Sequence, residues 1–276
     1  MNKTEVQQKL SNELKIQGKS PKTIKMYWFY NEKFLDFIKK DPDAIITEDV
    51  KTYLAYLISE QHYDAASVSL ARSALKYFYD GLLGKKIVSD IKTPKKQRKL
   101  PDVPTKEEIR QLIDSTKKLR NKLLIEFMYS SGLRVSECAK LKKSDLNIEE
   151  NTGLLKSGKG GKDRFFILST TLVVHLKEYL EKRDNDSEYI FPGPKGYIST
   201  RNIQRIISNS AKKSGIKKNI YCHLLRHAFA THLLEAGVDI RKIQELLAHS
   251  NLQTTQWYTQ VSTKELRKVK SPLDSI

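Results

Sequence analysis

The first 91 residues show the hydrophobic periodicity of four amphipathic helices. Apolar residues recur at steps of three or four, so each segment has a single apolar stripe, and four such helices pack into a small bundle. Ser20 followed by Pro21 is typical of an N-cap with proline at the first helical position, and Gly84 closes the last helix. The helices are predicted to begin at Thr4, Pro21, Thr47 and Ser67.

The next stretch, residues 92–104, has no regular periodicity. It reads KTPKKQRKLPDVP, with three prolines and with five basic residues between Lys92 and Lys99. Proline and charge repulsion favour an extended chain, so this stretch is predicted to be a cationic linker. It is either a solvated tether or a segment that lies along phosphates, and we favour the second. The candidate phosphate contacts are Lys95, Lys96, Arg98 and Lys99.

Residues 105–276 form the predicted second domain, which is mostly helical. Thr105 and Glu108 make a capping box for its first helix. The apolar helix KLLIEFMYSSG ends at Gly132, and the helix after it carries Arg134 in its first turn.

Between residues 145 and 168 the pattern becomes that of strands. Two apolar arms flank the sequence GKGGK, which is typical of a β-hairpin with a glycine-rich tip. Lys159 stands between Gly158 and Gly160, so its backbone can approach a ligand closely. The tip lacks the Gly-Lys-Ser/Thr of a nucleotide-binding P-loop. The fold class is therefore mainly α with a small β-sheet.

The charge of the chain indicates its partner. Fifty Lys and Arg against 32 Asp and Glu give a formal charge of +18 and a pI near 9.6. A lysine-rich solubility surface and a membrane-surface helix are the alternatives, but no stretch pairs a lysine face with a wide apolar face. Nucleic acid is the expected partner. The sequence contains no membrane span, signal peptide or disulfide framework, so a cytoplasmic location is expected.

Residues 222–250, CHLLRHAFATHLLEAGVDIRKIQELLAHS, contain most of the candidate chemistry. His223 and Arg226 are three apart and share a helix face. Each histidine could be a core or capping residue. His223 and His227 have metal-ligand spacing, but the adjacent glutamate of a zincin is absent and Arg226 would repel an ion. A thiol nucleophile at Cys222 is disfavoured because sequence neighbours on a helix point apart.

The segment LAHSNLQTTQWYTQV, residues 247–261, places Tyr258 nine positions after His249. Most tyrosines pack through the ring, with the hydroxyl as a polar tip. Packing beside Trp257 is therefore the default interpretation of Tyr258, and only the rest of the chain argues against it.

Five motifs together resemble the tyrosine recombinase family, and within it the Xer group, including its archaeal members. They are SGLRVSE, SGKGGKDR, HLLRHAFATHLLEAG, LLAHSNLQTTQWYTQV and the helical N-terminal region, in family order over essentially the full length. The resemblance implies six catalytic residues, with Tyr258 as the nucleophile: Arg134, Lys159, His223, Arg226, His249 and Tyr258. Ala248 stands where glycine is usual and Gln260 where histidine is frequent, and neither change affects the chemistry.

The resemblance also implies an architecture and an activity. Residues 1–91 would be a SAM-like core-binding domain of four helices, and residues 105–276 a catalytic domain. Four protomers would synapse two specific duplex sites and exchange strands through a 3′-phosphotyrosyl intermediate, in Xer-type resolution of chromosome dimers, alone or with a second recombinase or a translocase. The alternatives are an element-borne integrase, a type IB topoisomerase and a catalytically silent DNA-binding regulator.

Physical chemistry supports these roles without any cofactor, metal or ATP. Arg134 and Arg226 can each hold a phosphate oxygen through two nitrogens. His223 can help to move the tyrosine proton, His249 can hydrogen-bond the phosphoryl oxygens, and Lys159 can protonate the departing 5′-oxygen. Two further predictions accompany these roles. Glu137 either orients Arg134 or is a surface carboxylate. Ser262 and Glu265 open a predicted tail helix at about 262–271, which docks on its own domain or, as the resemblance implies, inserts into a neighbouring protomer.

Overall fold

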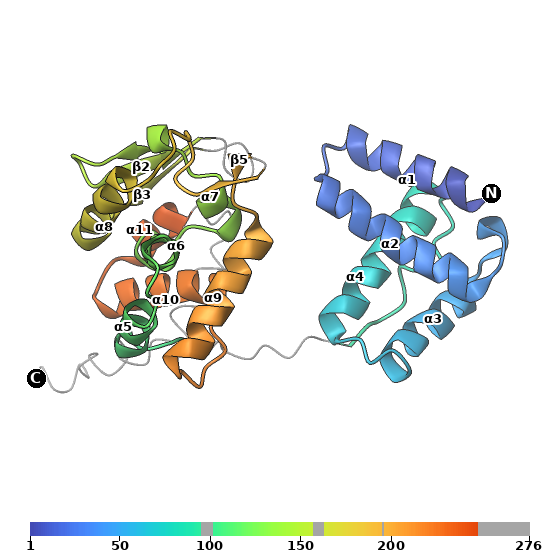
Figure 1. The fold of residues 1–276 in the computed structure, drawn as a ribbon. Helices are drawn as coiled ribbons and strands as arrows, with labels where there is room; N and C mark the ends of the chain where they lie inside the picture. The colour runs from blue at the N-terminus through green and yellow to red at the C-terminus, as the bar shows by residue number, and fades with distance from the viewer. Residues whose placement is uncertain (95–101, 157–162, 195, 248–276) are drawn as a thin grey trace, which may run out of the picture. The chain divides into compact units, whose positions relative to one another are not determined.

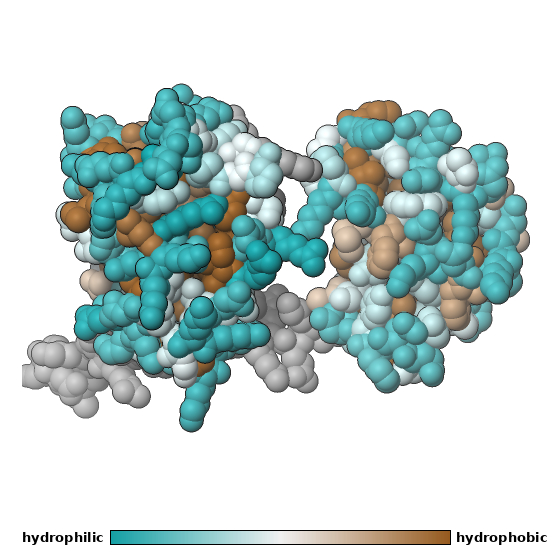
Figure 2. Space-filling view, viewed as in Figure 1, coloured by the Kyte–Doolittle hydropathy of each residue, from teal (hydrophilic) through white to brown (hydrophobic). Residues whose placement is uncertain are grey.

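The computed structural model describes residues 1–94, 102–156, 163–194 and 196–247. The chain divides into two compact units, Met1–Arg98 and Lys99–Ile276. Each unit has its own hydrophobic core. Both are mainly helical, as expected, and in the view of Figure 2 hydrophilic side chains cover most of each. No helix among the described residues is long and apolar enough to cross a bilayer.

The N-terminal unit contains the four predicted helices, with a π-helical turn at the end of the last (Figure 1). Their apolar stripes meet in a core that includes Leu10, Phe34 and Leu75, each fully buried. The elements are α1 (Lys3–Ile16), α2 (Pro21–Ile38), η1 (Pro42–Ala44), α3 (Thr47–Ser59), α4 (Ala65–Lys76) and η2 (Tyr77–Leu82).

Two of these helices begin earlier than predicted. Helix α1 begins at Lys3 because the Asn2 side chain accepts a hydrogen bond from the Glu5 amide, 2.9 Å away. Helix α4 begins at Ala65 rather than Ser67. Asp64 is its N-cap, and its carboxylate accepts from the Ser67 amide at 2.7 Å. In each case the side chain of an upstream Asn or Asp caps the helix.

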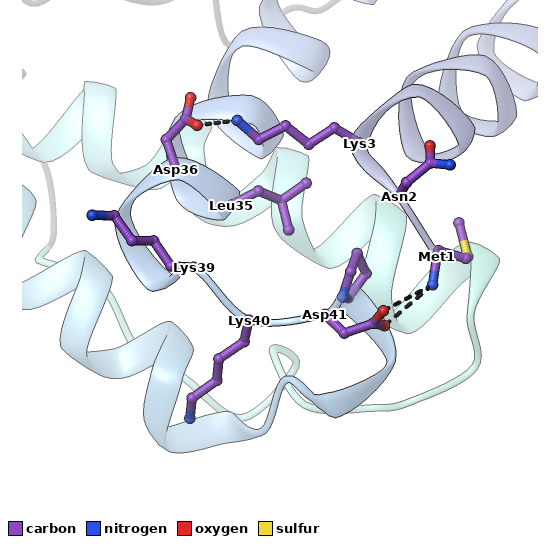
Figure 3. Close-up of a pocket in the computed structure, with 9 residues that line it drawn as sticks. Met1, Asn2, Lys3, Leu35, Asp36, Lys39, Lys40 and Asp41 are labelled. Carbon is purple, nitrogen blue, oxygen red and sulfur yellow. Dashed lines mark hydrogen bonds and ion pairs between the residues drawn. The ribbon is translucent and has the colours of Figure 1, made fainter.

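Ion pairs join the first residues of the chain to the end of α2 and the turn after it (Figure 3). The Met1 ammonium lies 3.2 Å from Asp41 and 2.9 Å from Asp43, and Lys3 pairs with Asp36. These contacts hold the start of α1 against the end of α2 and line a cavity of about 330 Å³. Of the residues predicted to act on phosphate, those that the structure describes do not line this cavity.

The C-terminal unit packs its helices around α6 and α10, with the strands and α8 at one end (Figure 1). Its helices are α5 (Lys106–Asp114), α6 (Leu119–Ser130), α7 (Val135–Ala139), η3 (Lys143–Asp145), α8 (Thr170–Glu181), α9 (Thr200–Ser214), α10 (Cys222–Glu235) and α11 (Ile240–Leu247). Its strands are β1 (Leu146–Asn147), β2 (Thr152–Leu155), β3 (Arg164–Ile167), β4 (Pro192–Gly193) and β5 (Gly196–Tyr197).

The predicted hairpin is present as an antiparallel pair of β2 and β3, and β1 completes a three-stranded sheet. Leu155 pairs with Arg164, and Gly153 pairs with Phe166. A Cβ at Gly153 would lie 2.2 Å from the Phe166 ring, so only glycine fits there. The hairpin tip, with Lys159, lies outside the described residues.

Candidate functional site

The site is built around one carboxylate, that of Glu137, which lies in the short helix α7. Its Oε1 accepts a hydrogen bond from Arg134 Nη1 at 2.6 Å, and its Oε2 accepts from the Arg134 backbone amide at 2.7 Å. Arg134 is the N-cap residue, immediately before the first turn in which it was predicted. The two residues are three apart, so one carboxylate fixes both the backbone and the side chain of Arg134. Of the two alternatives for Glu137, the contact with Arg134 is confirmed.

A second predicted arginine, Arg226, stands on α10 and is only 1% exposed. It donates to the carbonyls of Gly132 at 2.6 Å and Leu247 at 2.5 Å. Its Nη1 also lies 3.9 Å from Glu137 Oε2. The Leu247 carbonyl, at the end of α11, accepts from Arg134 as well, at 3.5 Å. The last carbonyls of a helix lack partners within the helix and lie at the negative end of its dipole, so cationic donors stabilise them. The bonds from Arg134 and Arg226 to Leu247 therefore hold α7 and α10 against the end of α11.

A third arginine in this cluster, Arg164, was not predicted. It begins β3, and its side chain is 3% exposed. Its Nη2 lies 2.5 Å from Glu137 Oε2, and its Nη1 donates to the Leu246 carbonyl. In the strand, Arg164 and Phe166 are buried while Phe165 and Ile167 are exposed, so a charged residue occupies the inward face. The sequence RFFI does not reveal this, because three successive apolar residues follow the arginine. A buried charge requires a partner.

The cluster is strongly cationic. Burial alone would raise the pKa of Glu137, but Arg164 and the hydrogen bonds from Arg134 hold that pKa below its ordinary value. The carboxylate is therefore ionised at neutral pH. Counting only the residues that the structure describes, three guanidinium groups and one carboxylate give the cluster an excess of positive charge, which is suited to an anionic ligand.

Gly132 permits the close packing behind this cluster. Its φ is +59°, a conformation that glycine adopts without strain, and an added Cβ would lie 2.6 Å from Phe229 and 2.9 Å from Leu247. Gly132, just after the end of α6, thus allows its own carbonyl, which accepts a hydrogen bond from Arg226, to lie close to α10 and α11.

A cavity of about 500 Å³ opens beside the cluster. It is lined by Arg134, His223 and Arg226, together with residues of α9. Partial burial, then repulsion from Arg226 and Arg134, lowers the pKa of His223. His223 is therefore neutral near pH 7 and able to accept a proton. The structure brings these three predicted residues to one cavity.

His227, one turn further along α10, faces the ring of His223, with ring centroids 4.3 Å apart. Burial, then His223 and Arg226, lowers its pKa to about 4. No group of three or more His, Cys, Asp or Glu within the described ranges could hold a metal ion. Within the part of the chain that the structure describes, the pair His223 and His227 therefore does not belong to such a group.

Cys222 does not have the properties of a nucleophile. Burial raises the pKa of its thiol to about 11, and it raises that of Cys138 further still. Because the thiolate is the reactive form, both cysteines are inert at neutral pH.

A second cavity, of about 1,070 Å³, continues from the first along α9 to β4 and β5. The two share Ser136, Gln204 and Ser208, so they form one groove. Among the described lining residues, no carboxylate is present and the charged side chains are all cationic. They are Arg120, Arg134, Lys140, Arg201, Arg205 and Arg226. A groove whose described charged residues are all cationic is suited to a polyanion.

The remaining predicted site residues lie outside the described residues. These are Lys159, His249 and Tyr258, the four linker residues Lys95, Lys96, Arg98 and Lys99, and the tail segment 262–271. Helix α11 ends at Leu247, two positions before His249.

Comparison with known proteins identifies the family. Residues 103–265 match the phage integrase family, and residues 7–88 match the N-terminal SAM-like domain of phage integrases. The chain belongs to this family of tyrosine recombinases. Tyrosine recombinase XerA of Pyrococcus horikoshii is 38% identical over 271 residues, which cover 96% of this chain and 92% of that protein. Tyrosine recombinase XerD of Oceanobacillus iheyensis is 34% identical over 274 residues, covering 91% of each.

Solved structures agree with this assignment. A crystal structure of XerA recombinase is similar with 33% identity and a TM-score of 0.57, covering 97% of each chain. The XerH recombinase bound to its difH substrate matches with 25% identity and a TM-score of 0.71, covering 89% of this chain and 78% of that one. A lambda integrase dimer on a core site shares the fold, with 20% identity, a TM-score of 0.78 and coverage of 97% and 98%. The family and the fold inferred from the motifs are confirmed.

Proposed function

We propose that this tyrosine recombinase cleaves and rejoins duplex DNA at a specific site through a covalent bond between Tyr258 and a 3′-phosphate. The observation that supports this most is the pair Arg134 and Arg226, fixed by hydrogen bonds beside a cavity that His223 also lines. Two rigid cations can stabilise negative charge on nonbridging phosphate oxygens with no reorganisation during the reaction.

The proposed step is an in-line displacement at phosphorus. The Tyr258 oxygen forms a bond to phosphorus while the bond to the 5′-oxygen breaks, which leaves a phosphotyrosyl ester and a free 5′-hydroxyl. His223, neutral because its pKa is lowered, accepts the tyrosine proton. Lys159 supplies a proton to the 5′-oxygen, and His249 hydrogen-bonds a phosphoryl oxygen. The reverse reaction with a different 5′-hydroxyl joins a new strand.

This chemistry needs no metal ion or nucleotide, because the arginines supply the positive charge and the ester conserves the phosphodiester bond energy. A nicked suicide substrate, from which the 5′ fragment diffuses away, should trap a covalent protein–DNA adduct in the presence of EDTA. Loss of the adduct in chelator, and its recovery with one divalent ion, would overturn the metal-free proposal.

The DNA would occupy the groove along α9, and the linker lysines and arginine would extend the phosphate contacts beyond it. Two DNA complexes among the similar structures, those of XerH and lambda integrase, support duplex DNA as the partner. We further propose a tetramer in the synapse, with the tail segment 262–271 exchanged between protomers.

Within the family, we propose the Xer role, resolution of chromosome dimers, because XerA proteins match this chain over 96% of its length. Element-borne integration is the alternative, since a putative integrase/recombinase of Sinorhizobium fredii is 32% identical. Sequencing the DNA that the protein captures covalently decides between them. One site on the host chromosome supports the Xer role, and sites at the ends of a mobile element contradict it. Formation of Holliday junctions would exclude a type IB topoisomerase, which only relaxes supercoils. Covalent capture of DNA would exclude a catalytically silent regulator.

A further inference from the structure

Arg164 is a buried arginine with two partners. Its Nη2 lies 2.5 Å from Glu137 Oε2, and its Nη1 donates to the carbonyl of Leu246 near the end of α11. The side chain is 3% exposed, which is unusual for a charged group away from a ligand. Strand β3, which Arg164 begins, is in this way tied to both α7 and α11.

The position of Arg164 rules out direct contact with the phosphate. Arg226 is also buried and bonded to protein oxygens, but it lines the cavity together with Arg134 and His223, whereas Arg164 does not. Any effect of Arg164 on the reaction must therefore pass through the oxygens of its own partners, Glu137 and Leu246.

The oxygen that matters is on Glu137. The same carboxylate holds the Arg134 side chain through Oε1 and the Arg134 amide through Oε2. Burial raises the pKa of Glu137, and the charge of Arg164 and the hydrogen bonds and charge of Arg134 together lower it. With Arg164 in place, the negative charge of Glu137 is shared, and Arg134 keeps positive charge for a phosphate. Without it, Arg134 would be the nearer of the remaining arginine partners of Glu137, and the carboxylate would neutralise more of its charge.

We propose that Arg164 is a positioning residue: it fixes and neutralises Glu137, and through Glu137 it sets the position and effective charge of the Arg134 guanidinium. This inference rests on the proposed strand cleavage. The Leu246 carbonyl accepts a hydrogen bond from the other terminal nitrogen of Arg164, and this bond fixes the guanidinium group that contacts Glu137. Arginine is required because lysine cannot hold two acceptors with one planar group.

A double-mutant cycle tests the proposal by separating action through Glu137 from a general structural role. The full chain carries Arg164→Met, Glu137→Gln, or both, and the rate of adduct formation on a saturating nicked substrate is measured beside DNA affinity. Arg183→Met is the matched control. Arg183 also donates to backbone carbonyls, those of Ser187 at 2.7 Å and Tyr189 at 2.8 Å, but it lies outside the Glu137 cluster.

Arg164→Met should slow adduct formation on the order of 10–100-fold, the loss expected when a catalytic group is misplaced by about 1 Å, while DNA affinity changes less than about threefold. In the Glu137→Gln background the same change should slow the rate by less than about threefold. Arg183→Met should have one and the same effect in both backgrounds. Arg164→Lys should be faster than Arg164→Met but slower than the parent, because lysine keeps the positive charge but cannot hold both acceptors at once.

Equal slowing by Arg164→Met in both backgrounds would overturn the proposal, as would an unchanged rate in the single variant. If Arg164→Met does not fold, the cycle with Arg164→Lys decides by the same criterion. A parent protein that binds DNA yet forms no adduct would overturn the proposed function, and this inference with it. An adduct with additive effects would overturn only the role of Arg164.

Discussion

Replacement of Gly132 by alanine tests whether the backbone behind Arg226 is as tightly constrained as the structure indicates. Gly132 has a φ of +59°, and an added Cβ would meet Phe229 Cδ1 at 2.6 Å, Phe229 Cε1 at 2.8 Å and Leu247 Cδ2 at 2.9 Å. All three distances are shorter than carbon atoms tolerate. Neither neighbour can move freely, because both are buried in the core between α10 and α11.

The expected loss has two parts. A non-glycine residue in the left-handed region costs about 1–2 kcal/mol, and overpacking a core costs about 1–3 kcal/mol. The free energy of unfolding of the C-terminal unit should therefore fall by about 2–5 kcal/mol, which lowers its melting temperature by roughly 4–20 °C. Gly215→Ala is the matched control. Its φ is +73°, but nothing lies within 4 Å of the added Cβ, so only the first part applies.

Calorimetry of the full chain measures the stability of each variant, and adduct formation measures the chemistry at a temperature where both are folded. Because Arg226 donates to the Gly132 carbonyl, Gly132→Ala should also slow the adduct on the order of 10–100-fold, and Gly215→Ala should leave the rate close to that of the parent. Equal destabilisation by the two variants would refute the packing argument. A full rate in folded Gly132→Ala would refute the link from this carbonyl to Arg226.

Three further predictions follow from the charges and roles assigned above. Lys159→Ala should slow cleavage of ordinary DNA by about 10²–10⁴-fold and be largely rescued by a bridging 5′-sulfur, whose thiolate leaves without a proton; equal slowness on both substrates would remove the general-acid role. Alanine at Lys95, Lys96, Arg98 and Lys99 together should weaken binding to all DNA sequences and flatten its dependence on salt, and an unchanged slope would make the linker a tether. The pKa of His227 is about 4 in the folded state, against 6.5 ordinarily. As the pH falls, the unfolded chain therefore binds a proton at this residue before the folded chain does, and the free energy of unfolding should decrease between about pH 6.5 and about pH 4. His227→Gln should flatten this decline in urea titrations, and an identical decline in both proteins would contradict the assignment.

Local signals allowed much of the fold to be predicted from sequence. Apolar periodicity located every helix of the N-terminal unit, and the Thr105 capping box was correct to the residue. The errors were at three helix starts: Asn2 and Asp64 are the actual caps of α1 and α4, and Arg134 is the N-cap of α7 rather than part of its first turn. Several polar residues near a helix start can each serve as a cap, and periodicity alone does not choose among them.

The site was predicted less completely because part of it depends on contacts between distant segments. The Arg134–Glu137 pair spans one turn and was recognisable from spacing. The Arg164–Glu137 pair joins residues 27 apart on a strand and a helix, so no local pattern indicates it. The carbonyls of Gly132 and Leu247 as partners of Arg226 also appear only once α6, α10 and α11 are packed together.

The central claim is that Tyr258 is the nucleophile, and identification of the DNA-linked residue tests it most directly. The parent protein is incubated with a nicked duplex site in EDTA, digested with protease and nuclease, and analysed by mass spectrometry, with Tyr258→Phe treated in parallel. We predict a nucleotide 3′-phosphate attached to the peptide that contains Tyr258, and no adduct with Tyr258→Phe although that variant still binds the site. A DNA adduct at another residue, or an undiminished adduct with Tyr258→Phe, would contradict the account.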